Sequence, residues 1–172
     1  MALVLLCLGV ATTACRREST PKTARDWARA LLDKYPYPAV TGADGQGEDG
    51  RLAPLLDSYL LYLSAESDEE LLAAAASFDE VVTEIPDLTE AHLLRGVCLV
   101  LAQRHQEALA PLEAVVAEAP RFPPARWFLA QALFGLGRDE EALGHLPVIV
   151  EIGGEYAPEA DQILAVAALE SD

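Results

Sequence analysis

Apolar residues recur at helical spacing over most of the chain, and they divide it into amphipathic segments. Residues 19–35 predict the first amphipathic helix, which Thr20 and Pro21 begin and Pro36 ends. The apolar face of this helix consists of Ala24, Trp27, Ala28, Leu31 and Tyr35. Residues 36–54 hold three prolines and four glycines, so they predict a linker or surface loop. From residue 55 onward the helical pattern returns.

The pattern of small and apolar residues then repeats every 34 positions. Ala74, Ala108 and Ala142 are spaced in this way, and so are Leu112 and Leu146. The three repeats are 55–88, 89–122 and 123–156. Small residues at shared positions allow the two helices of a hairpin to approach closely. One hairpin cannot bury its apolar face alone, so we expect three hairpins to stack around a continuous core.

A 34-residue period with these positions resembles the tetratricopeptide repeat (TPR). In the second repeat Gly96, Ala108 and Pro120 occupy the small-residue and terminal-proline positions of the family pattern. The resemblance implies an all-α fold, an α-solenoid of three TPR helix-turn-helix hairpins over residues 55–156. We expect an N-terminal helix before this solenoid, and a capping helix over residues 157–172 that covers its last exposed side.

The N-terminus predicts export from the cytoplasm. Residues 1–14 are uncharged, mostly apolar and too short to span a hydrocarbon core, which takes about 20 helical residues, so they predict a signal peptide. The small residues directly before Cys15 resemble a bacterial lipoprotein signal. That resemblance implies lipidation of Cys15, a lipidated arm over residues 15–35, and a location at the outer membrane facing the periplasm. An ordinary secretion signal, giving a periplasmic or secreted protein, and a short uncleaved anchor stay open as alternatives.

The charge of the chain disfavours nucleic acid as a partner. Its 12 Lys and Arg stand against 28 Asp and Glu, and the resulting net charge of −16 repels phosphate. Residues 16–34 run against this trend, because six basic and three acidic side chains give them a net charge of +3.

We expect no catalytic, cofactor-binding or metal site, so the sequence predicts a protein that is not an enzyme. His92, His105 and His145 stand at three different repeat positions and are expected to lie apart rather than share a metal ion. Phosphate-binding glycine loops, nucleophile elbows and zinc-protease motifs do not occur in the sequence. Cys98 lies among Val and Leu and predicts a buried apolar thiol.

In the TPR family three positions of each first helix face a concave groove, and the resemblance carries these positions onto this chain. The groove residues so implied are Tyr59, Leu63, Leu93, Val97, Val100, Trp127, Gln131 and Phe134. They predict a mostly apolar groove with aromatic anchors, suited to a partner helix or an extended peptide. The alternative occupant is the chain's own helix around Trp27, lying in or beside the groove.

Together these features predict a protein-interaction scaffold of the bacterial cell envelope, similar to TPR lipoproteins that assist outer-membrane assembly, secretion or pilus systems. One alternative is an assembly factor of the cytochrome c maturation type, which would capture an apocytochrome peptide. The other is a self-associating structural protein, in which the helix around Trp27 enters the groove of another copy.

Overall fold

The computed structural model describes residues 53–170, and within this range the chain is built from helices alone. The seven helices are α4 (Ala53–Ser64), α5 (Asp68–Glu84), α6 (Thr89–Leu101), α7 (His105–Glu118), α8 (Pro123–Gly135), α9 (Asp139–Ile152) and α10 (Ala157–Glu170). None of them has the length and apolar character needed to cross a membrane. The predicted signal peptide, the arm with its amphipathic helix and most of the linker lie outside the described residues. The last two linker positions instead begin α4, because proline is tolerated in the first turn of a helix.

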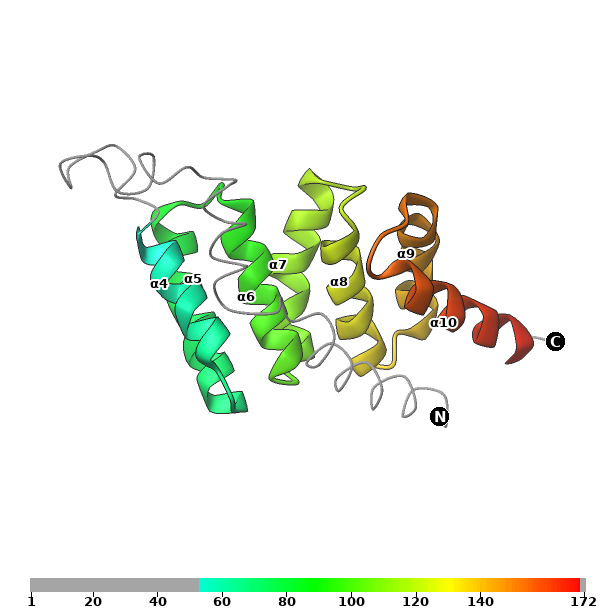
Figure 1. Cartoon of the computed structure of the whole chain (residues 1–172), viewed down its shortest axis with the longest axis horizontal. Coiled ribbons are helices and arrows are strands. Elements are labelled where there is room, and N and C mark those ends of the chain that lie inside the picture. The colour runs from blue at the N-terminus through cyan, green and yellow to red at the C-terminus, as the bar shows by residue number, and fades with distance from the viewer. Residues whose placement is uncertain (1–52, 171–172) are drawn as a thin grey trace.

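The first six described helices form three hairpins, α4/α5, α6/α7 and α8/α9, which follow one another in a row (Figure 1). Neighbouring hairpins contact each other where α5 packs on α6 and where α7 packs on α8. The first helices also touch along the row, α4 with α6 and α6 with α8. The last helix, α10, packs against α9 at the C-terminal end. This arrangement confirms the predicted all-α repeat solenoid.

The positions that recur every 34 residues are also fully buried. The side chains with 0% exposure include Ala74, Phe78, Ala108, Leu112, Ala142 and Leu146. Gly96 shows why one of the positions must be small, since a Cβ atom built on it would lie 2.5 Å from Cγ of Leu112. Cys98 is buried in the same core, as predicted, and desolvation by burial raises the pKa of its thiol to about 12.

The turns inside the second and third hairpins share one backbone conformation, again 34 residues apart. Gln103 has φ 60° and Gly137 has φ 73°, so both lie in the left-handed region. In each turn the following residue, Arg104 or Arg138, donates its backbone N–H to a carbonyl of the first helix, at 2.8 and 3.0 Å. Glycine adopts this conformation without strain, whereas Gln103 carries a side chain there.

The second helix of the first hairpin begins with a capping box. The Ser67 hydroxyl accepts a hydrogen bond from the backbone N–H of Glu70 at 3.3 Å. In return the Glu70 carboxylate accepts from the backbone N–H of Glu66 at 2.6 Å and of Ser67 at 3.1 Å. These two hydrogen bonds, that from Glu66 foremost, lower the pKa of Glu70.

Candidate protein-binding groove

The residues predicted to line a groove lie on the first helices of the hairpins, α4, α6 and α8, and their exposure divides them into two sets. The closed set, in the core, is Tyr59 (3% exposed), Val97 (4%), Val100 (4%) and Trp127 (2%). The open set, partly exposed, is Leu63, Leu93, Gln131 and Phe134. Only half of the eight predicted residues are therefore accessible to a partner.

Trp127, one of the predicted aromatic anchors, is a core residue, which corrects the prediction. Its indole stacks on the ring of Tyr156, with 5.6 Å between the ring centroids. Tyr156 also meets Phe128 edge to face, at 6.2 Å. Because Tyr156 lies in the turn between α9 and α10, this turn closes over Trp127. A partner could reach the indole only by displacing Tyr156.

The other closed positions are also corrections, and each has a packing reason. Val97 and Val100 lie on α6, which packs against α4, α5, α7 and α8 and so has little surface left to expose. Tyr59 is buried near Tyr62, with 6.0 Å between their ring centroids. Desolvation by burial raises the pKa of Tyr59, so its hydroxyl stays protonated.

The open set offers apolar contacts together with one amide. Leu63, Leu93 and Phe134 are partly buried and rest against the hydrophobic core. Side chains held in this way form a fixed surface, so a partner would not have to order them on binding. Gln131 adds an amide that can both donate and accept hydrogen bonds.

The surface of the solenoid is strongly acidic. Residues 53–170 contain five Arg, no Lys and 21 Asp and Glu, a net charge of 5 − 21 = −16. Each arginine is already engaged within the fold: Arg95 with Asp79 (3.1 Å), Arg104 with Glu107, Arg121 with Glu151 (3.0 Å), Arg126 with the Pro120 carbonyl, and Arg138 with Glu141 (2.7 Å). The unbalanced charge is therefore negative and favours a basic or apolar partner.

The three histidines make separate local contacts. Nε2 of His92 lies 2.8 Å from the Pro86 carbonyl oxygen, and Nε2 of His105 lies 3.2 Å from Oε1 of Gln103. His145 interacts through Nδ1 with the Arg126 guanidinium at 3.2 Å. Burial lowers the pKa of both His105 and His145. Among residues 53–170 no three His, Cys, Asp or Glu side chains gather in a way that could hold a metal ion.

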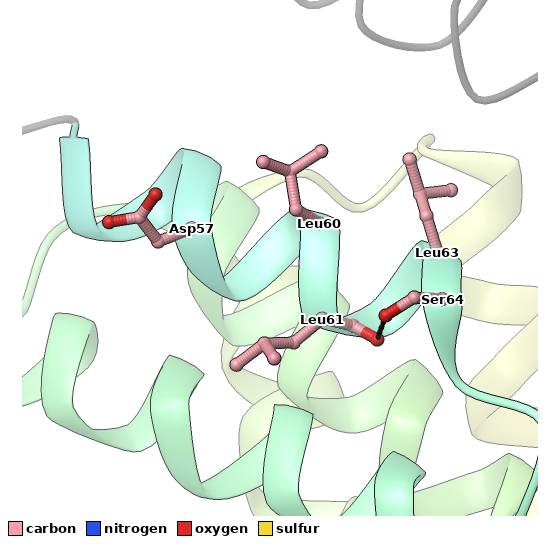
Figure 2. Close-up of a pocket in the computed structure, with 5 residues that line it drawn as sticks. All are labelled: Asp57, Leu60, Leu61, Leu63 and Ser64. Carbon is pink, nitrogen blue, oxygen red and sulfur yellow. Dashed lines mark hydrogen bonds between the residues drawn. The ribbon is translucent and has the colours of Figure 1, made fainter.

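A second surface feature, which the sequence reasoning missed, lies on α4. A hollow of about 620 Å³ is lined, among the described residues, by Asp57, Leu60, Leu61, Leu63 and Ser64. Figure 2 shows Leu60 and Leu63 projecting to the same side of the helix, and Ser64 hydrogen-bonded to the Leu61 carbonyl at 3.1 Å. The sequence does carry a sign of this surface, since residues 60–63 are three leucines and a tyrosine. Four apolar residues in succession are too many for a helix that has one side facing solvent.

Part of the solenoid matches a known protein family. Residues 99–167 match the tetratricopeptide repeat family. The match begins near the end of α6 and continues through α7, α8 and α9 into α10. TPR repeats generally mediate protein–protein interactions, so the match supports a protein-binding role. Comparisons with curated proteins and with solved structures gave no match.

Proposed function

We propose that this protein is a non-enzymatic interaction scaffold of the bacterial cell envelope, which binds a partner helix or peptide through its TPR groove. The observation that carries the proposal is the open set, Leu63, Leu93, Gln131 and Phe134, on the first helices of a TPR-like solenoid. An apolar strip on a rigid scaffold is the kind of surface that an amphipathic helix recognises. The net negative charge of residues 53–170 would favour a partner that carries basic residues beside its apolar face.

A pair of substitutions tests the groove. Phe134→Glu places a negative charge in the strip, whereas Ala114→Glu places the same charge on an exposed position of α7, a second helix. The full chain and both variants would be used to capture proteins from envelope fractions, with circular dichroism as the check on folding. We expect one envelope protein to be enriched by the full chain and by Ala114→Glu, and its recovery to be lost with Phe134→Glu. Equal recovery with both variants would contradict binding through the groove.

We further propose that Cys15 carries lipid and holds the protein at the outer membrane, facing the periplasm. The support is the uncharged apolar stretch over residues 1–14 with small residues directly before Cys15. Metabolic labelling with a fatty acid, followed by membrane fractionation, tests this in the producing bacterium. We expect label on the full chain and none on Cys15→Ser. An unlabelled full chain in the soluble periplasmic fraction would contradict the anchor and would favour an ordinary secretion signal.

The partner recovered through the groove would decide between the envelope systems. A component of outer-membrane assembly, of a secretion system or of a pilus would support the scaffold role in that system. Tight binding of a peptide containing Cys-x-x-Cys-His would instead favour the cytochrome c maturation type of assembly factor. Recovery of the protein itself, with a sedimentation coefficient that rises with concentration, would favour a self-associating structural role.

A further inference from the structure

The first helix of the solenoid leaves an apolar face uncovered. On α4, Leu60 is 56% exposed and Leu61 is 46% exposed, and both line the hollow described above. Asp57 and Ser64, which stand about one helical turn on either side of them, are exposed as well. Leu60 and Leu61 stand out on the solenoid, because the leucines of α5 to α9 are all buried or partly buried.

Three of these four positions, those of Asp57, Leu61 and Ser64, have equivalents in the other two hairpins that are largely covered. The positions 34 and 68 residues after Asp57, Leu61 and Ser64 are Ala91, Arg95, Cys98, Ala125, Leu129 and Ala132. Of these, the four Ala and Cys side chains are 0% exposed and Leu129 is 3% exposed. Arg95 identifies what covers them, because its guanidinium reaches Asp79 on α5, the second helix of the preceding hairpin.

In the repeat, therefore, this face of a first helix packs against the second helix of the preceding hairpin. In the structure α5 covers α6 and α7 covers α8 in this way. Within residues 53–170 no helix precedes α4, so its face has no counterpart to α5 or α7. A helix supplied from the preceding sequence would complete the pattern.

We propose that residues 19–35 of the same chain dock on this face of α4 and cap the N-terminal end of the solenoid. Their sequence pattern predicts an amphipathic helix with Trp27 and Leu31 on its apolar face. A large aromatic side chain such as Trp27 suits a hollow bordered by Leu60 and Leu61. The proposal places the segment at the end of the solenoid, against the outer face of its first helix, and does not depend on the proposed function of the groove.

The length of the connecting chain permits this docking. Residues 36–52 connect the segment to α4, and a random coil of 17 residues would have a typical end-to-end distance of about 23 Å. The 12 residues of α4 extend over about 18 Å. The segment can therefore reach either end of α4, and in particular can run antiparallel to it, as a preceding second helix would.

Charge complementarity favours the same arrangement. Residues 16–34 carry a net charge of +3, whereas residues 53–84, the first hairpin, contain eight acidic side chains and no Lys or Arg. Four of those acidic residues lie within residues 66–70, at the turn that follows α4. In the antiparallel arrangement the basic beginning of the segment would lie near this turn, so the attraction selects this direction as well as this face.

Acrylamide quenching of tryptophan fluorescence in the full chain tests the proposal. Trp27 and Trp127 are the two tryptophans, and Trp127 is 2% exposed, so quenching reports on Trp27. Two charge-matched pairs of variants probe the two sides of the contact. Leu31→Glu and its control Arg29→Gln, on the opposite side of the predicted helix and away from its basic beginning, both lower the net charge by one. Leu61→Glu and its control Ala76→Glu, at an exposed position of α5, also change the charge equally.

We expect a low quenching constant for the full chain and both controls, and a severalfold increase in Leu31→Glu and Leu61→Glu while circular dichroism stays unchanged. These values should not depend on protein concentration. A full chain quenched as strongly as free tryptophan would overturn the proposal. If Trp27 stayed protected from quenching in Leu61→Glu, the proposal would also be overturned, because Trp27 would be buried elsewhere. If the protection of Trp27 were lost on dilution, the contact would belong to a second copy of the chain.

Discussion

Gly96 is the position where the close approach of two helices can be tested most sharply. Replacing it by alanine adds a Cβ atom 2.5 Å from Cγ and 2.7 Å from Cδ2 of Leu112, whose side chain is fully buried. Such overpacking costs about 1–3 kcal/mol. The same substitution gains about 1 kcal/mol of helix propensity, so we expect Gly96→Ala to destabilise the protein by between zero and about 2 kcal/mol.

Gly144 provides the matched control for this prediction. It lies inside α9 and is exposed, and a Cβ atom built on it meets nothing within 4 Å. Gly144→Ala should therefore stabilise the protein by about 0.5–1 kcal/mol through helix propensity alone. The difference between the two variants removes the propensity contribution and isolates the contact, which we expect to be worth about 1–3 kcal/mol.

Urea unfolding followed by circular dichroism measures both variants. A further variant, Leu112→Ala, makes room for the added methyl group, so the cost of Gly96→Ala should disappear in that background and the two substitutions should be strongly non-additive. If Gly96→Ala stabilised the protein as much as Gly144→Ala does, the close packing of α6 on α7 at this position would be refuted.

Three further predictions follow from single side chains. Trp127→Ala should lower the free energy of unfolding by about 3–5 kcal/mol, because it removes a buried indole and its stacking on Tyr156, and urea unfolding measures the loss. The pKa of Glu70 is lowered in the folded state, so its carboxylate stabilises the fold at pH values above 4.5, the pKa of the unfolded state. This stabilisation is lost as the pH falls through the folded pKa. Unfolding measured at several pH values should therefore show that Glu70→Gln loses less free energy of unfolding in acid than the unsubstituted chain does. Cys98, with a pKa of about 12, should resist a thiol reagent at mildly alkaline pH in a chain whose other cysteines are serine, and should react fully once urea unfolds the protein.

The repeat architecture could be predicted from the sequence because equivalent positions pack in the same way in each repeat. Ala74, Ala108 and Ala142 all stand where a second helix passes close to a first helix, and all three are fully buried. The left-handed turns at Gln103 and Gly137 follow the same period, although Gln103 gives no sign of it in its residue type. Local spacing is sufficient here since every hairpin is built from neighbouring residues.

The candidate site was harder to predict because it depends on contacts between residues far apart in the pattern. Trp127 occupies a groove position of the family, but Tyr156, the last residue of the third repeat, stacks over it. Likewise Leu61 is exposed while its equivalent Leu129 is buried, and in the described structure a helix precedes the hairpin of Leu129 but not that of Leu61. A position in a repeat therefore predicts the backbone well and the exposure less well near the ends of the array.

Photo-crosslinking in the living cell tests the central claim, that the groove binds a protein partner. A photoreactive amino acid would replace Gln131, in the open set on α8, or Ala114, on the exposed side of α7. We predict one discrete crosslinked envelope protein from position 131 and none from position 114, with the product lost when Phe134→Glu is added. A hot-spot contact of about 2 kcal/mol corresponds to a roughly 30-fold loss of affinity, enough to abolish the product. The same product from both positions, or none from position 131 in the presence of normally folded protein, would contradict the claim.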